Sequence, residues 1–231
     1  MTVSDVNQSE ANSKNTMAST PEKNVSLVNI ATQLIGQIPD IPVMLKGVFE
    51  LVTSKPEKKK SIGLLLEKHA RQQPDHIAVR YQDITLTYAQ VNERANQMAH
   101  FFVSKGISSG DTIAVVLENR PETLVCVFAA VKLGAICSMI NTSQRGEVLL
   151  HSLNLVQPKL IVVGEEMLDN VGTVEADLSD DVRSALYYLS DNGSVGCPKH
   201  YKDLDAACAN QARSNPASTS EVRMHQPCYY I

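Results

Sequence analysis

Hydrophobic positions recur with two alternating patterns between residues 61 and 164. Some segments place apolar residues three or four positions apart, as amphipathic helices do, while others are short continuous apolar runs of the kind found in buried strands. Helices that alternate with buried strands indicate a parallel sheet covered on both faces. The pattern therefore predicts an α/β fold, a partial doubly wound sheet with flanking helices. Beyond Gly164 the pattern is weaker.

The clearest pattern is a strand, a helix and a second strand between Gly110 and Asn141. Residues 111–117 and Ala135–Ile140 form the two apolar runs, and the helix between them extends to Gly134. The length and order of these segments are those of a βαβ crossover.

Two helix starts carry capping signals. Asn119 stands before Pro121 and three residues before Glu122, so we expect Asn119 to cap the helix of the crossover. Thr87 and Gln90 have the spacing of a capping box. The same criteria predict further helices over Ser61–Gln73, Tyr88–Ser104, Gly146–Leu155 and Tyr201–Asn210, a hairpin of Ile77–Tyr81 and Ile84–Thr87, and strands over Lys159–Val163 and Ala185–Leu189.

The N-terminal part divides into a polar tail, residues 1–24, and an apolar and basic segment, residues 25–60, ahead of an α/β domain over 61–231. Prolines and charges interrupt the apolar stretch, so a membrane-spanning helix is not expected. Two amphipathic helices, 26–37 and 43–52, remain, either packed on the domain or lying on a membrane interface. The basic run 55–60 is either a solvated linker or a contact for anionic lipid headgroups.

Several short motifs occur together in order. They are Thr87-Tyr88 before Asn92 and Asn96, Gly110-Asp111, Asn119, Lys132-Leu133-Gly134-Ala135 and Asn141-Thr142, followed by Arg145, Leu149, Leu150, His151 and Ser152. Together they resemble the adenylate-forming acyl-CoA synthetases. The last group resembles most the long-chain and very-long-chain fatty acid–CoA ligase branch, which includes the fatty acid transport proteins. The resemblance is strong over residues 61–164.

The resemblance implies a large N-terminal domain of the adenylate-forming fold. Such enzymes carry a TSGTTG-x-PK phosphate loop after a strand that Cys228–Ile231 resembles, so the loop and the remaining catalytic motifs would lie beyond Ile231. The chain is then the N-terminal portion of a ligase and inactive alone. The complete enzyme would use ATP, Mg and CoA and a fatty acid substrate. The incomplete sheet would leave an edge at residues 229–231 open to self-association.

No catalytic, cofactor-binding or metal residue is assigned in this chain. GxGxxG and GxxxxGK[ST] motifs do not occur. For each remaining candidate we expect a structural and not a catalytic role. His151 is expected to be a hydrogen-bonded structural histidine, Glu165-Glu166 a solvated first helical turn, and Asp180-Asp181 a surface turn or helix start. Asp191–Gly196 is expected to be a plain turn, and Asn141–Ser143 to cap the next helix.

Composition adds exclusions. The 231 residues are 43% hydrophobic and carry a net charge of −4, so nothing favours nucleic acid as a partner. The five cysteines form no CxxC pair, and Cys126 and Cys137 fit buried hydrophobic positions. The start of the chain lacks a secretory signal pattern, so we expect a cytoplasmic protein, with peripheral attachment at the inner face of a membrane as an option. Two alternatives stay open: a non-catalytic membrane- or protein-binding α/β module, and an adenylation domain of a peptide synthetase or luciferase-like relative.

Overall fold

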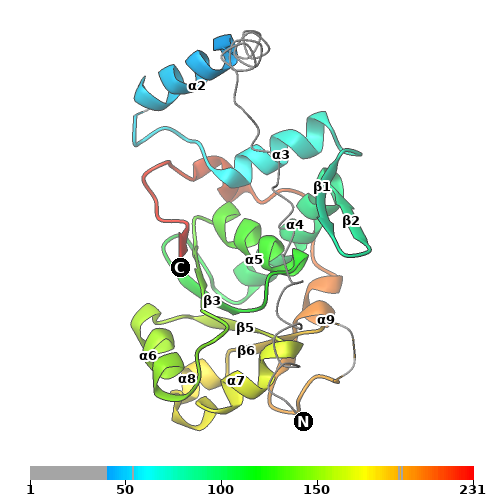
Figure 1. Ribbon diagram of the computed structural model, residues 1–231, viewed down its shortest axis with the longest axis vertical. Coiled ribbons are helices and arrows are strands. Elements are labelled where there is room, and N and C mark those ends of the chain that lie inside the picture. The colour runs from blue at the N-terminus through cyan, green and yellow to red at the C-terminus, as the bar shows by residue number, and fades with distance from the viewer. Residues whose placement is uncertain (1–40, 54, 192, 194) are drawn as a thin grey trace, which may run out of the picture. The chain divides into compact units, whose positions relative to one another are not determined.

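The computed structural model describes residues 41–53, 55–191, 193 and 195–231 (Figure 1). The chain divides into two units between Ser54 and Lys55, and each is described by itself. In the first unit, helix α2 (Ile41–Thr53) contains the predicted helix 43–52. The predicted tail 1–24 and helix 26–37 lie outside the described residues. No helix in the described ranges combines the length and apolar character required to cross a bilayer.

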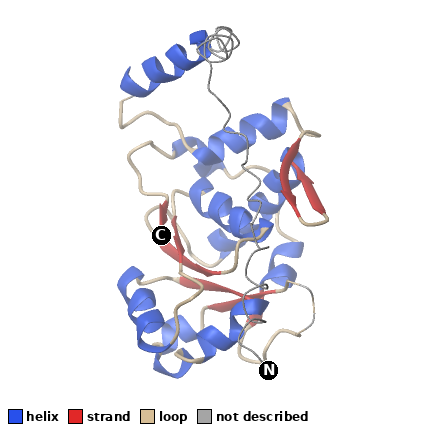
Figure 2. Ribbon diagram, viewed as in Figure 1, coloured by secondary structure: helices blue, strands red, loops and turns tan. Residues whose placement is uncertain are grey.

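The second unit is built on a six-stranded sheet in the order β7-β6-β5-β3-β4-β8. Every neighbouring pair is parallel, which confirms the predicted α/β sheet (Figure 2). The strands are β3 (Thr112–Val116), β4 (Ile136–Met139), β5 (Leu160–Gly164), β6 (Leu186–Leu189), β7 (Lys202–Asp203) and β8 (Tyr229–Tyr230).

Helices cover both faces of this sheet, as a doubly wound fold requires (Figure 1). One face carries α3 (Ile62–Gln72), α4 (Tyr88–Ser104), α5 (Pro121–Lys132) and α9 (Leu204–Ala209), and the other carries α6 (Gly146–Val156), α7 (Leu168–Gly172) and α8 (Asp180–Arg183). Short 3-10 turns η2 (Glu165–Met167), η3 (Glu175–Asp177) and η4 (Ala217–Glu221) complete the unit. A two-stranded hairpin, β1 (Ile77–Tyr81) and β2 (Ile84–Thr87), precedes α4.

The strands read as continuous apolar runs because both of their faces are buried. Ile113 and Val115 on β3 belong to the hydrophobic core that contains α4 and α5. Their neighbours Ala114 and Val116 belong to the second core, which contains α6 and α7. Successive side chains of a strand point to opposite faces, so one five-residue strand supplies both cores.

The structure confirms two local sequence predictions, the capping box at Thr87 and the hairpin that precedes it. The Thr87 hydroxyl accepts a hydrogen bond from the Gln90 N–H at 3.3 Å, and the Gln90 side chain accepts one from the Thr87 N–H at 2.9 Å. This capping box starts α4 at Tyr88, as predicted. The predicted hairpin also forms with its predicted strand limits.

Two predicted caps are wrong. Helix α5 has Arg120 rather than Asn119 as its N-cap, because Pro121 disfavours helical geometry in the residue before it and leaves Arg120 extended (φ −142, ψ 168). Asn141 accepts a hydrogen bond from the Ser143 N–H at 2.9 Å, which forms a local turn. Helix α6 begins later, with Arg145 as its N-cap, so residues 141–143 do not cap it.

The C-terminal part differs in one element. The predicted helix 201–210 is instead β7 followed by the shorter α9, which Asp203 caps by accepting a hydrogen bond from the Ala206 N–H. The predicted strand at the end of the chain is present as β8, which pairs with β4 and forms the edge of the described sheet.

Candidate functional site

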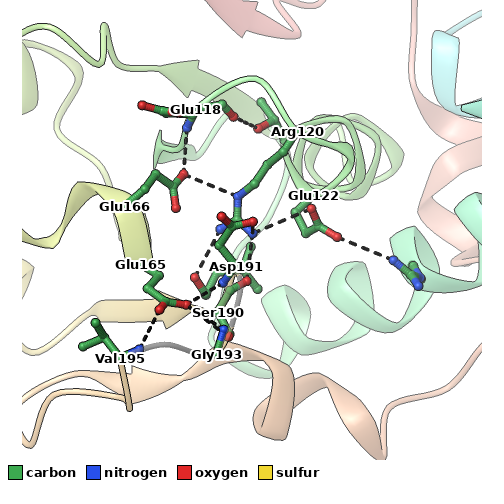
Figure 3. A network of polar contacts seen from close by, with 12 residues as sticks. Glu118, Arg120, Glu122, Glu165, Glu166, Ser190, Asp191, Gly193 and Val195 are labelled. Atoms are coloured by element: carbon green, nitrogen blue, oxygen red, sulfur yellow. Dashed lines mark hydrogen bonds and ion pairs between the residues drawn. The ribbon is translucent and has the colours of Figure 1, made fainter. Parts of the chain in front are cut away.

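The order of the strands marks the carboxyl ends of the central strands as the candidate site. Strand β3 lies between β4 and β5, and the helices that follow β3 and β5 pack on opposite faces. The crevice between the carboxyl ends of β3 and β5 is therefore a topological switch point, where open α/β sheets bind ligands. Polar residues from the loops after β3, β5 and β6 meet there (Figure 3).

Arg120 lies at the centre of this group. Its side chain is only 4% exposed. It donates hydrogen bonds to the backbone carbonyls of Leu189, the last residue of β6, and Ser190, the next residue, at 3.2 and 2.8 Å. The guanidinium also forms ion pairs with three carboxylates, those of Glu166 (3.4 Å), Asp191 (3.5 Å) and Glu122 (3.7 Å). A buried arginine is stable only with such partners, so this group is one connected network.

Glu166 joins the first two loops. Its Oε1 accepts a hydrogen bond from the Glu118 N–H at 2.9 Å and lies 3.4 Å from Arg120 Nε. Glu118 follows β3 and Glu166 follows β5, so this carboxylate closes the crevice at the switch point (Figure 3).

Glu165 holds the third loop. Its buried carboxylate accepts backbone hydrogen bonds from Val195 (2.6 Å), Asp191 (2.9 Å) and Gly193 (3.1 Å). The Tyr188 hydroxyl donates to the Val195 carbonyl and holds the same loop. Backbone N–H groups that converge on one point can bind an anion. Here the bound anion is a side chain of the protein itself.

The prediction for Glu165-Glu166 is half right: they do form the first turn of a helical segment, η2, but Glu165 is buried, Glu166 is only partly exposed, and both belong to the network instead of facing solvent. Within the predicted turn Asp191–Gly196, the described residues Asp191, Gly193 and Val195 are bends, and their N–H groups do bind an anion, the Glu165 carboxylate. Arg120 was not predicted. The one signal in the sequence was that Glu165-Glu166 directly follow a buried strand, at the sheet edge where loops converge.

The network acts as a latch rather than a vacant binding site. The described donors of the 191–195 loop bond to Glu165, and Arg120 donates to two carbonyls, while its Nε lies 3.4 Å from the Glu166 carboxylate without a hydrogen bond in the described residues. An adjacent hollow of about 260 Å³ is lined by Leu117, Glu118, Asn119 and Thr142. The described residues at this crevice therefore do not fit the phosphates of ATP, which require available donors or cations.

A larger hollow of about 460 Å³ lies farther along the sheet, beside β4, β8 and α6. Its lining combines Ser138, Asn141 and Gln144 with apolar Met139, Leu155 and Tyr230. It reaches the carboxyl ends of β4 and β8, so a segment continuing from β8 would begin beside it.

The remaining candidates lie apart from this edge. His151 is exposed on α6, so the expected hydrogen-bonded structural position is wrong. Asp180-Asp181 start α8, as predicted. Cys126 and Cys137 are buried, also as predicted, and burial raises the pKa of Cys126 well above its ordinary value and that of Cys137 to about 12. Both thiols stay protonated near neutral pH and are poor nucleophiles.

Comparison with known proteins identifies the fold and the family. The family model for AMP-binding enzymes matches residues 66–231. The chain is 30% identical over 210 residues to a medium/long-chain fatty acid–CoA ligase of Mycobacterium tuberculosis, a match that covers 90% of this chain and 32% of the relative. It is 30% identical over 148 residues to human long-chain fatty acid transport protein 6, covering 62% of this chain and 24% of that protein.

A solved anthranilate–CoA ligase shares the fold, with a TM-score of 0.66 and 19% identity over 74% of this chain and 31% of the solved chain. This chain therefore spans about a quarter to a third of the length of these relatives. The family model covers most of the second unit, including β3 to β8 and the latch. The chain belongs to the adenylate-forming AMP-binding enzymes, the family that includes the fatty acid–CoA ligases.

Proposed function

We propose that this chain is the N-terminal portion of a long-chain or very-long-chain fatty acid–CoA ligase and that it is inactive alone. The complete enzyme would use Mg and ATP to form an acyl-adenylate and would then transfer the acyl group to the thiol of CoA. The printed names of the two curated relatives support the fatty acid branch. The observation that carries the proposal is the family match, which extends through the edge strand β8.

Within this proposal the chain supplies a scaffold, and none of its described residues is catalytic. The latch of Arg120, Glu165 and Glu166 ties together the loops after β3, β5 and β6. The 460 Å³ hollow, with Leu155 and Tyr230 in its wall, would border the acyl site. Rigid loops at the carboxyl edge would keep that wall in place while the chemistry occurs elsewhere in the enzyme.

Fatty-acid-dependent exchange of pyrophosphate into ATP tests the proposal. We expect no exchange by this chain alone and clear exchange by a full-length fatty acid–CoA ligase assayed in parallel. Exchange by the isolated chain would contradict its inactivity. The intact mass of the protein in its own cells is a second test. A species of more than twice 25.2 kDa supports the proposal, and a stable species of 25.2 kDa contradicts it.

A second candidate function is a non-catalytic module that binds membranes or proteins through residues 25–60. Its support is helix α2, where Met44, Leu45, Val48 and Phe49 recur at helical spacing and are exposed, Phe49 by 69%. Cosedimentation with anionic vesicles tests it, because Phe49→Gln should reduce binding while Thr53→Gln, also on α2, should not. Binding that ignores both changes would contradict it.

Self-association through β8 is part of the main proposal. Tyr229 and Tyr230 are exposed, and β8 is the edge strand of the described sheet. Unpaired strand edges pair readily with other chains. Light scattering should show concentration-dependent association that Tyr229→Pro weakens, because the Cys137 N–H bonds the Cys228 carbonyl in this parallel pair and the Tyr229 N–H therefore lies on the free edge. A monomer at high concentration would contradict this part.

A further inference from the structure

A hollow of about 480 Å³ opens at the amino ends of the strands, between α3 and residues 222–228. Figure 1 shows the α3 ribbon beside the red C-terminal segment. Gly134 and Ala135, just before β4, and Cys228, just before β8, line it. Because the strands are parallel, this hollow lies at the opposite edge of the sheet from the Arg120 latch.

Hydrogen bonds hold the walls of the hollow. The basic run 55–60 is attached to the C-terminal segment, with the Met224 N–H donating to the Lys58 carbonyl at 3.0 Å and the His225 N–H donating to the Pro56 carbonyl at 3.2 Å. Lys59 forms an ion pair with Glu221 at 2.7 Å. The hollow is therefore bounded by chain segments that are tied to one another, as preformed ligand pockets are.

Helix α3 also approaches α5 closely behind the hollow. A Cβ added at Gly63 would lie 3.1 Å from Lys132 Cγ and 3.3 Å from Thr219 Cγ2, so any side chain at this position would require these neighbours to shift. This contact turns Ile62 and Leu65 away from α5, and both are exposed where they line the hollow, Leu65 by 51%.

The lining combines an apolar surface with cations. Ile62, Leu65 and Met224 are large exposed hydrophobic side chains. Lys60, Lys68 and Arg223 also line the hollow, and its described lining contains no carboxylate. Apolar surface exposed in a hollow whose described lining has cations and no carboxylate fits a ligand with an alkyl chain and an anionic headgroup.

We propose that this hollow binds a free single-chain fatty acid in its carboxylate form. The alkyl chain lies against Ile62, Leu65 and Met224, and the carboxylate lies among Lys60, Lys68 and Arg223. The volume is within the roughly 300–1,000 Å³ usual for small-molecule sites. The proposal rests on the hollow itself and requires neither nucleotide nor acyl-adenylate formation, so it stands or falls separately from the proposed ligase function.

Photolabelling of the full chain with a diazirine-bearing dodecanoate, at concentrations below micelle formation, tests where the ligand lies. We expect labelled peptides from residues 60–68 and 222–228. Labelling confined to the hollow near Leu155 and Tyr230 would overturn the proposal, because that hollow lies on the α6 face. Binding seen only with anionic vesicles and never with monomeric dodecanoate would also overturn it, in favour of a membrane surface.

Calorimetric titration with dodecanoate tests the chemistry. Lys68→Glu and Leu65→Gln, each at an exposed position, should weaken binding about fivefold. The matched controls Lys199→Glu and Val148→Gln are exposed outside this hollow and should leave affinity unchanged. Dodecyltrimethylammonium should bind more weakly than dodecanoate. Equal affinity for the two headgroups, or unchanged binding by both test variants, would contradict the assignment.

Discussion

Helix α5 has a buried cation at each end, and the two are neutralised differently. Arg120, at the N-terminal end, meets three carboxylates and two backbone carbonyls. Lys132, in the last turn, has no exposed surface and meets one carboxylate, Glu67 at 2.8 Å, and the Asn215 side chain at 3.3 Å. A helix dipole disfavours a cation at its N-terminus and favours one at its C-terminus. A buried cation at the N-terminal end of this helix is therefore accompanied by more carboxylates than a buried cation in its last turn.

The two ends also differ in what surrounds them. Around Arg120, side chains fill the crevice between β3 and β5 and tie three loops together. Near Lys132, the neighbouring residues Val131, Gly134 and Ala135 line an open apolar hollow. The crevice at the carboxyl ends of β3 and β5 is thus closed by polar contacts, while the hollow at the amino ends of β4 and β8 stays accessible. The following changes test that contrast.

The largest effect is expected from Arg120→Met, which removes the buried cation that three carboxylates share, although Glu122 keeps its ion pair with Arg94 at 3.6 Å. We expect the free energy of unfolding to fall by about 3–5 kcal/mol in urea titrations followed by circular dichroism. Arg120→Lys should recover only part of this, because an ammonium lacks the planar fork of donors. The control is Arg183→Met, where the arginine is partly exposed and bonds mainly to the carbonyls of Glu175, Ala176 and Leu178. Equal losses at both arginines would contradict the central role of Arg120.

A smaller loss, about 2–3 kcal/mol, is expected for Lys132→Met, because its partner Glu67 retains some contact with water. Burial lowers the pKa of Lys132, and the Glu67 carboxylate opposes that shift. The double variant Lys132→Met with Glu67→Leu should therefore regain most of the lost stability. The corresponding Arg120→Met with Glu166→Leu should not, since Glu122 and Asp191 remain. Rescue at both ends would remove the contrast between them.

Glu165→Gln should cost about 1–3 kcal/mol, since three backbone N–H groups lose a charged acceptor. Hydrogen exchange should accelerate at the amides of Asp191, Gly193 and Val195 before the rest of the sheet opens. Glu147→Gln, an exposed position in the first turn of α6, is the matched control and should change neither quantity by much. Unchanged exchange in the 191–195 loop would show that Glu165 does not hold it.

The smallest effect concerns Asp111, at the amino edge before β3. Burial acts to raise the pKa of this carboxyl, but hydrogen bonds from Lys159 and Ser108 outweigh burial and lower the pKa below 3.8. The folded-state pKa is thus below the unfolded value, so Asp111 stabilises the fold above about pH 4 and loses this contribution as the pH falls through the folded value. The free energy of unfolding, measured in urea, should fall between about pH 5 and about pH 3 in both proteins. In Asp111→Asn this fall should be smaller than in the unchanged protein, by up to about 1 kcal/mol. An identical difference in both proteins would contradict this.

Much of the fold was predictable because its signals are local or periodic. Thr87 and Gln90 place the start of α4 through contacts only three residues apart. The apolar runs at β3 and β5 reveal strands with two buried faces, because each strand serves both cores. The failures are also local: Pro121, one residue after Arg120, outweighed the capping preference of Asn119.

The candidate site was less predictable. Glu165 was expected in solvent because an acidic residue at a helix start is usually stabilised there by the dipole. Its actual partners are 26 to 30 positions away in the chain, on a loop whose position depends on β6. The partners of Arg120 include carbonyls 69 and 70 positions away. No window of sequence contains both sides of such contacts.

By itself the sequence determined the order of the helices and strands from α3 to β5 and the resemblance to the family, because periodicity, turns and motifs are carried by neighbouring residues, but it missed β7 in the C-terminal part. Tertiary structure alone decided which charged side chains are buried and which hollow stays open. Those outcomes depend on the strand order β6-β5-β3-β4-β8, which brings the loops at residues 118–120, 165–166 and 190–195 to the carboxyl ends of the strands and residues 59–68 and 222–228 to their amino ends. A buried charge is stable only where distant parts of the chain supply its partners.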